Sequence, residues 1–241
     1  METPAGAEQP GHSGNSAPLA AVVLAGGRAT RLGGADKPAI TIQGRSLLST
    51  AVRAALNVGT SRVVIVGPRR PGLIRELAGD PPRSASVAVE FTTEQPPGAG
   101  PVPAVRAGLE LVSEPWLLLL AADLPFLRGD HLSALRTAAS RASAGSGAIF
   151  VDHQGHPQWL AGCWQTARLR TALGRYEGSS LGGLLGPLTP VRITAGAAAG
   201  MGLQGEAPPW FDCDTSEDVA AALALAAHNR SAEDQEQPTE E

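Results

Sequence analysis

Short runs of apolar residues alternate with segments of helical periodicity through the first half of the chain. Continuous apolar runs of about 4–8 residues are typical of strands covered on both faces, and apolar residues recurring every 3–4 or so positions are typical of amphipathic helices. The predicted strands are Ala20–Leu24, Arg62–Val66, Val87–Phe91 and Trp116–Ala121. The predicted helices are Leu47–Leu56 with Ser46 as its cap, Pro103–Leu111 and His131–Ala142. This alternation predicts a mostly parallel sheet joined by right-handed crossovers.

The pattern is less regular in the second half of the chain. Gly147–Val151 and Trp159–Trp164 are predicted to pair as a β-hairpin around the turn at residues 152–157. The other predicted elements are a helix over Ala167–Gly174, a strand over Val191–Thr194, a Gly/Ala-rich loop over Ala195–Ala207 and a closing helix over Glu217–Ala227. All elements together predict a single α/β domain, a Rossmann-like sheet within three α/β/α layers.

Both ends of the chain lack hydrophobic periodicity. Residues 1–18 are rich in Gly, Ser, Pro and Ala, and residues 229–241 are mostly acidic and polar. Compositions of this kind are typical of disordered tails. We therefore expect a disordered N-terminal tail over 1–18, one folded domain over 19–228 and a disordered acidic C-terminal tail over 229–241.

Charge and cysteine content narrow the class of protein. A formal net charge of −4 gives no basic footprint for nucleic acid, so no nucleic-acid partner is expected. The longest apolar run, Trp116–Ala122, is far shorter than the roughly 18 residues of a membrane span, so no membrane partner is expected. Cys163 and Cys213 form no CxxC pair, which disfavours a zinc site or a disulfide scaffold. Without a secretory signal, the expected location is the cytoplasm.

The loop after the first predicted strand combines glycines with positive charge. Gly26 and Gly27 let the backbone come close to a ligand and can turn N–H groups toward phosphate oxygens. Arg28, Arg31 and Lys37 add three cations, and Lys37 is the only lysine among the 19 Lys and Arg residues. The spacing is neither that of a P-loop nor that of a Rossmann dinucleotide motif. The loop indicates a phosphate site, with a flexible turn and solvated arginines as the alternative.

Carboxylates follow two later parts of the predicted fold. Asp123 comes after the most apolar strand, and ligands of open α/β sheets bind at the carboxyl ends of strands. There it is a natural Mg²⁺ ligand facing a phosphate, although an Asp that caps the turn before Pro125 is the alternative. Asp212 and Asp214 can share a face, and Asp214 is the better candidate for a second metal contact. Residues 215–218 are expected to cap the final helix.

Residues 24–37 resemble the signature L-A-G-G-x-x-x-R-M-G-x-x-D-K of the MobA-like NTP transferases, the family of molybdenum cofactor guanylyltransferase, with Leu32 in place of the usual Met. The match continues over Pro38–Leu47. Weaker segments follow in the family's order, namely Gly100-Pro101-Val102 with Ala107-Gly108-Leu109, then Asp123-Leu124-Pro125, then residues 214–218. The resemblance spans roughly residues 20–225 and implies a fold of the nucleotide-diphospho-sugar transferase type.

The resemblance also implies roles for individual residues. Those implied to bind the nucleotide are Leu24, Ala25, Gly26, Gly27, Arg28, Arg31, Lys37, Glu94 and Asp123. Arg31, Lys37 and Asp123 are the implied catalytic residues, the two cations lying at the phosphates. Asp123 is implied to hold Mg²⁺, with Asp214 as a second contact. His153 and His156 lie in a turn that the family uses near the acceptor, and a plain surface position is the alternative for His153.

The implied reaction is attack by a phosphate of an acceptor on the α-phosphorus of a nucleoside triphosphate, with release of pyrophosphate. The first hypothesis is Mg²⁺-dependent transfer of GMP from GTP to molybdopterin cofactor. Val66 stands where guanylyltransferases often have Asn, so transfer of CMP or another nucleotide, to molybdopterin or another phosphorylated metabolite, is the alternative. A non-catalytic nucleotide-binding protein on the same fold predicts the loss of Lys37 or Asp123, and both are present.

Overall fold

The computed structural model describes residues 17–26, 36–78, 87–142, 145–194, 197 and 207–236, with the backbone alone described for 229–236. Seven strands form the main sheet, in the order β5-β4-β1-β6-β8-β7-β9. Their bounds are β1 Leu19–Leu24, β4 Arg62–Val66, β5 Ala88–Thr92, β6 Trp116–Ala121, β7 Gly147–Val151, β8 Pro157–Gln165 and β9 Val191–Thr194. Only β8 runs antiparallel to its neighbours, so six of these strands end at one edge of the sheet. The predicted mostly parallel sheet is confirmed.

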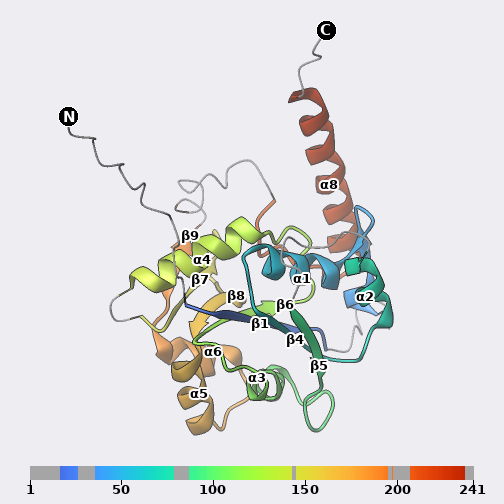
Figure 1. Cartoon of the computed structure of the whole chain (residues 1–241). Helices are drawn as coiled ribbons and strands as arrows, with labels where there is room; N and C mark the ends of the chain where they lie inside the picture. The colour runs from blue at the N-terminus through green and yellow to red at the C-terminus, as the bar shows by residue number, and fades with distance from the viewer. Residues whose placement is uncertain are drawn as a thin grey trace, which may run out of the picture.

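Helices cover both faces of this sheet. Their bounds are α1 Leu47–Asn57, α2 Pro71–Ala78, α3 Pro101–Glu110, α4 Gly129–Arg141, α5 Thr166–Arg175, α6 Leu181–Leu185 and α8 Ser216–Glu236, with short 3-10 turns η2 Lys37–Ala39 and η3 Gly186–Leu188. In Figure 1, α1 and α4 lie on one side of the sheet and α3, α5 and α6 on the other. The expected single three-layer α/β domain is confirmed.

The central strand β1 shows why its sequence reads as a continuous apolar run. Leu19, Ala21 and Val23 enter the core beneath α1 and α4. Ala20, Val22 and Leu24, which alternate with them, enter the core beneath α3 and α5. Because successive residues of a strand point to opposite faces, a strand buried on both faces needs an apolar residue at every position.

Several elements differ from expectation. Helix α2 was not predicted, because it buries only Leu73 and Leu77, one turn apart. A small hairpin of β2 Thr41–Ile42 and β3 Arg45–Ser46 precedes α1 and turns at Gly44, whose φ is +75°. The last helix, α8, continues to Glu236, inside the segment 229–241 predicted to be a disordered tail, and it projects from the body of the molecule in Figure 1.

The remaining expectations about regular structure hold closely. The predicted hairpin is formed by β7 and β8, with a register shift between Ile149 and Phe150. Ser46 caps α1, since its side chain accepts a hydrogen bond from the Ser49 N–H. All but two residues of the predicted loop over Ala195–Ala207 lie outside the described part of the chain. Within that part, no helix is long and apolar enough to cross a bilayer.

Candidate active site at the carboxyl edge of the sheet

The four parallel strands β5, β4, β1 and β6 end side by side, and their pairing continues one residue into the loops. The Ala25 N–H donates to the Val66 carbonyl at 2.8 Å, and the Ala122 N–H donates to the Leu24 carbonyl at 3.1 Å. The Gly67 N–H donates to the Thr92 carbonyl at 2.8 Å. These bonds hold the start of the glycine-rich loop between the loops that follow β4 and β6.

Gly67 brings the loop after β4 against the start of the glycine-rich loop more closely than any other residue type could. Its φ is +149°, and a Cβ built on it would lie 2.8 Å from the backbone C and O of Ala25 and 2.9 Å from the N of Gly26. Only glycine fits such an approach without moving backbone. Sequence reasoning missed this residue, although a glycine directly after a predicted strand was a signal for it.

Glu94 lies next to Gly26, and its implied role at the nucleotide stays a prediction. A Cβ on Gly26 would come 3.7 Å from Oε1 and 3.8 Å from Oε2 of Glu94. The Glu94 side chain is buried, and its Oε1 accepts a hydrogen bond from the Gly98 N–H at 2.8 Å. A carboxylate is therefore held beside the first glycine of the loop.

Lys37 stands between two carboxylates. Its ammonium group, carried by η2, forms hydrogen-bonded ion pairs with Asp123 after β6 and with Asp214 before α8. The Lys37 side chain is only 16% exposed. Burial lowers the pKa of Lys37, but hydrogen bonds and charge attraction from Asp123 and Asp214 outweigh it, so the pKa is raised and the group stays charged. The three predicted residues meet although they are far apart in the sequence.

The donor set suits a divalent cation that also binds phosphate. Oδ1 of Asp123 is buried and has no hydrogen-bond partner among the described residues, so it is a free oxygen ligand. Mg²⁺ is commonly held by one or two carboxylates together with water and substrate phosphates. No cluster of three or more His, Cys, Asp or Glu that could hold a metal occurs in the described part of the chain. Asp123 and Asp214 thus fit a site in which the cation is held partly by the protein and partly by substrate phosphates and water, and not one in which the protein supplies every ligand.

A third carboxylate, Asp212, adds negative charge to this corner. Burial raises the pKa of Asp212 above its usual value, and the nearby charges of Asp214 and Asp123 raise it further. Lys37 opposes that shift. A bound cation would relieve the same repulsion, which is a second indication that the corner suits positive charge.

The other residues predicted to bind the nucleotide fall into two groups. Leu24 and Ala25 are buried, and the Leu24 carbonyl and the Ala25 N–H bond to neighbouring loops, so their contact with a nucleotide stays a prediction. Gly27, Arg28 and Arg31 lie outside the described residues, and their roles stay predictions.

Val66, the residue in place of the family's Asn, is fully buried among apolar side chains. A Cβ on Gly108 of α3 would come 3.0 Å from its Cγ2, so the Val66 side chain points into the core beneath α3. It offers no hydrogen bond with which to read a base.

The turn between β7 and β8 lies at the same edge, because β8 runs antiparallel to both β6 and β7, so that β7 ends where β6 ends. Its Asp152 accepts hydrogen bonds from the N–H groups of Gln154 and His156 at 2.8 and 2.9 Å. Nδ1 of His156 lies 3.3 Å from Oδ2 of Asp152, and both His153 and His156 are exposed. The turn is therefore built around Asp152, and its histidines remain accessible.

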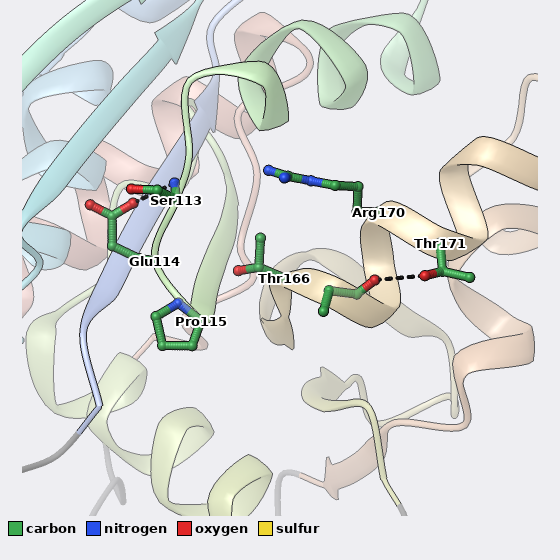
Figure 2. A pocket seen from close by; sticks show the side chains of 7 residues that line it. Ser113, Glu114, Pro115, Thr166, Arg170 and Thr171 are labelled. Carbon is green, nitrogen blue, oxygen red and sulfur yellow. Dashed lines mark hydrogen bonds between the residues drawn. The ribbon is translucent and has the colours of Figure 1, made fainter.

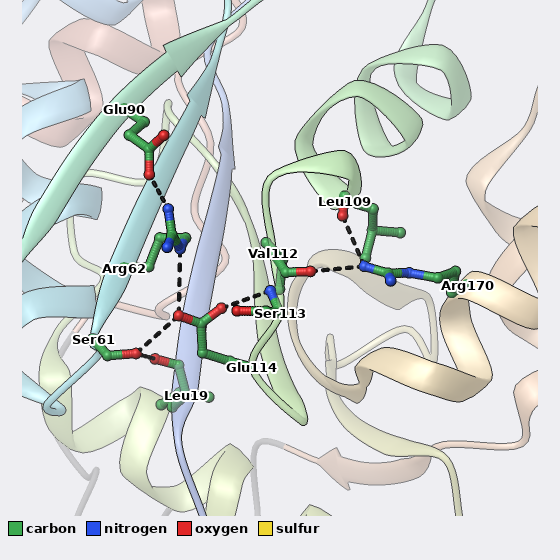
Figure 3. Close-up of polar contacts among 9 residues, drawn as sticks. All are labelled: Leu19, Ser61, Arg62, Glu90, Leu109, Val112, Ser113, Glu114 and Arg170. Carbon is green, nitrogen blue, oxygen red and sulfur yellow. Dashed lines mark hydrogen bonds and ion pairs between the residues drawn. The ribbon is translucent and has the colours of Figure 1, made fainter.

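A hollow of about 360 Å³ lies at the opposite edge of the sheet, where β6 begins (Figure 2). Two of its lining side chains, Glu114 and Arg170, bond within the protein, as Figure 3 shows, while Oγ1 of Thr166 is buried and has no hydrogen-bond partner among the described residues. Arg170 donates to the carbonyls of Leu109 and Val112 at 2.9 and 2.7 Å, where α3 ends, and Glu114 accepts from the Ser61 hydroxyl at 3.1 Å. These bonds join α5 to α3 and the start of β4 to that of β6.

Known proteins resemble this chain in sequence and in fold. The pattern that defines the MobA-like NTP transferase domain matches residues 21–190. Molybdenum cofactor guanylyltransferase of Bradyrhizobium sp. (strain ORS 278) is 32% identical over 214 residues, covering 86% of this chain and 92% of that protein. The protein of the same name from Nitrobacter hamburgensis (strain DSM 10229 / NCIMB 13809 / X14) is 29% identical over 221 residues, covering 87% and 95%.

A solved structure shows the same fold. Molybdopterin-guanine dinucleotide biosynthesis protein A from Archaeoglobus fulgidus has a TM-score of 0.62 at 18% identity, covering 87% of this chain and 99% of that one. The fold and the sequence relatives together define a nucleotidyltransferase. The chain belongs to the MobA-like NTP transferase family.

Proposed function

We propose that the protein transfers GMP from GTP to molybdopterin cofactor in a Mg²⁺-dependent reaction that releases pyrophosphate. The observation that carries this proposal is the meeting of Lys37, Asp123 and Asp214 at the carboxyl edge, beside the backbone of the glycine-rich loop. The names of its relatives support guanylyl transfer to this acceptor. The cytoplasmic location expected from the sequence stays a prediction.

The chain's own residues would act by positioning and by neutralising charge. Lys37, with Arg28 and Arg31 of the loop, would face the triphosphate, whose charge must be offset as pyrophosphate leaves. The backbone of Leu24 to Gly27 would lie against the nucleotide, with Glu94 at the side of Gly26. The acceptor's phosphate is already ionised at neutral pH, so the attack needs no catalytic base.

Asp123 and Asp214 are the residues that would hold Mg²⁺. When bound, the ion supplies positive charge to the phosphates and so favours attack at the α-phosphorus. The unpartnered oxygen of Asp123 is the main support for this assignment. Lys37 pairs with the other oxygen of Asp123, so it would remain beside the ion and the phosphates.

Transfer of CMP or another nucleotide is the second candidate. One observation favours it, because Val66 is an apolar core residue where guanylyltransferases often have Asn. A different base, or recognition of guanine by another residue, follows from that difference.

The test is to incubate the purified protein with molybdopterin, Mg²⁺ and GTP, CTP or ATP, and to measure pyrophosphate release. We expect turnover with GTP, and a loss of about 100-fold or more for Asp123→Asn. Asp130→Asn is the matched control, because Asp130 is exposed in the first turn of α4, where it pairs with Arg128. Turnover with CTP and none with GTP would replace the first candidate by the second.

A further inference from the structure

The segment that carries Lys37 is tied to the loop after β4 by a two-bond ion pair. Nε of Arg70 donates to Oδ2 of Asp36 at 3.0 Å, and Nη2 donates to Oδ1 at 2.6 Å. Nη1 of Arg70 also donates to the Pro68 carbonyl at 3.2 Å. The Arg70 side chain is only 14% exposed, while that of Asp36 is 54% exposed. The guanidinium is therefore fixed from its own loop and grips Asp36 in the geometry that a planar fork allows.

Asp36 is free to make this contact because of the residues that follow it. It stands at the N-cap of η2, where an Asp side chain usually accepts a hydrogen bond from the second or third N–H of the helix. The second residue is Pro38, which has no N–H, and the Ala39 N–H donates to the main-chain carbonyl of Asp36 at 2.8 Å. The carboxylate makes no capping bond and binds Arg70 instead.

Arg70 is itself held by the edge of the sheet. It directly precedes α2, and its carbonyl accepts a hydrogen bond from the Leu73 N–H at 3.1 Å. Strand β4 ends at Val66, and the next residue, Gly67, packs against Ala25 and Gly26. The loop between β4 and α2 thus contacts the start of the glycine-rich loop at one end and Asp36 at the other.

The ion pair forms part of the lining of a hollow. A cavity of about 390 Å³ lies between η2 and α2, and Asp36 and Arg70 are among its lining residues together with Pro38, Ser46 and Glu76. Because a hollow lies on this side of η2, polar contacts such as this one help to fix its position relative to the sheet.

We propose that Arg70 is a positioning residue, which acts through Asp36 to place the ammonium group of Lys37 at the two carboxylates of the site. This rests on the proposed function in one respect, the role of Lys37 at the phosphates. Asp36 is half exposed, and exposed ion pairs add little to stability. The pair therefore matters for where Lys37 lies more than for whether the chain folds.

The chain offers an unusually clean probe, since Lys37 is its only lysine. We would treat the nucleotide-free protein with a limiting dose of an amine-acylating reagent and follow modification of Lys37 by mass spectrometry. In the native protein modification is slow, because the side chain is 16% exposed between Asp123 and Asp214. In Arg70→Met we expect it to be about threefold faster, as for a side chain released to about half exposure.

Three further variants make the result specific. Arg75→Met removes an exposed arginine from α2, and it should leave the rate unchanged. Asp36→Asn should match Arg70→Met, and the double variant should be no faster than either single one. Arg70→Lys keeps the charge but loses the fork, so Lys37 should react faster than in the native protein, and the introduced amine is distinguished because it lies on a different peptide.

The same variants separate positioning from a purely structural role. For the nucleotide that the native protein uses, Arg70→Met should lower kcat by about tenfold while its unfolding transition stays near that of Arg75→Met. The proposal would be overturned if Lys37 were labelled at the native protein's rate in folded Asp36→Asn or in folded Arg70→Met. The labelling needs neither nucleotide nor acceptor, so a wrong substrate assignment would leave its outcome unchanged.

Discussion

Replacing Gly67 by alanine tests the contact between the loop after β4 and the start of the glycine-rich loop. The new Cβ would lie 2.8 Å from two backbone atoms of Ala25, and no side-chain rotation can relieve it. A φ of +149° costs an alanine about 1–3 kcal/mol, and displacing well-packed neighbours costs about 1–3 kcal/mol more. The expected loss in the free energy of unfolding is therefore about 2–6 kcal/mol.

The same displacement should reach the active site. Ala25 and Gly26 must move by several tenths of an ångström, and misplacement of this order can cost about 100-fold in rate. The assays are urea unfolding followed by tryptophan fluorescence, and pyrophosphate release at varied nucleotide concentration. We expect lower stability together with a lower kcat/KM for the nucleotide.

Gly72→Ala is the matched control. Gly72 lies in the first turn of α2, and a Cβ there would have nothing within 4 Å. Alanine should stabilise that helix by about 0.5–1 kcal/mol and leave kcat/KM unchanged. The close approach of the two loops would be refuted if Gly67→Ala had the same urea midpoint of unfolding and the same kcat/KM as the native protein.

Three further predictions concern other parts of the molecule. Lys37→Met frees Asp123 and Asp214, so nucleotide-free protein should bind Mn²⁺ about tenfold more tightly in an electron paramagnetic resonance titration; unchanged affinity would contradict competition for these carboxylates. Burial lowers the pKa of His131 from 6.5 to about 4, so the unfolded chain takes up the proton first as pH falls. As the pH falls from 6.5 to about 4, the free energy of unfolding should therefore drop by up to about 3 kcal/mol. Urea unfolding of His131→Gln at each pH should show a smaller drop, because the variant lacks this contribution. Ser46→Ala loses the cap of α1 and the 2.7 Å bond to Glu76, and should cost about 1–2 kcal/mol in the same assay; native stability would show that the cap is idle.

The sequence predicts the sheet well, because burial on both faces leaves a strong pattern. In β1 and β6 every position is apolar, so these strands stand out without reference to any partner. The residue types at the carboxyl edge also predict that Lys37 and Asp123 belong to one site. What a single chain cannot indicate is which charges meet after folding. Arg70 is one of 18 arginines in the sequence (19 Lys and Arg less the one Lys), and only the loop after β4 brings it to Asp36.

Other features are lost to sequence reasoning for local reasons. Helix α2 is short and buries two leucines, which is too little periodicity to separate it from a loop. Acidic composition predicts a tail after residue 228, yet the backbone stays helical to Glu236 because good helix formers such as Ala and Glu need no core to continue a helix already begun.

The fate of the α-phosphate tests nucleotidyl transfer most directly. GTP labelled with ³²P at the α-position would be incubated with the protein, Mg²⁺ and molybdopterin, and the products separated by chromatography. We predict that the label moves to the acceptor, that label at the γ-position leaves as pyrophosphate, and that Asp123→Asn abolishes both. Release of γ-label as inorganic phosphate, with the α-label kept in GDP, would contradict nucleotidyl transfer at this site.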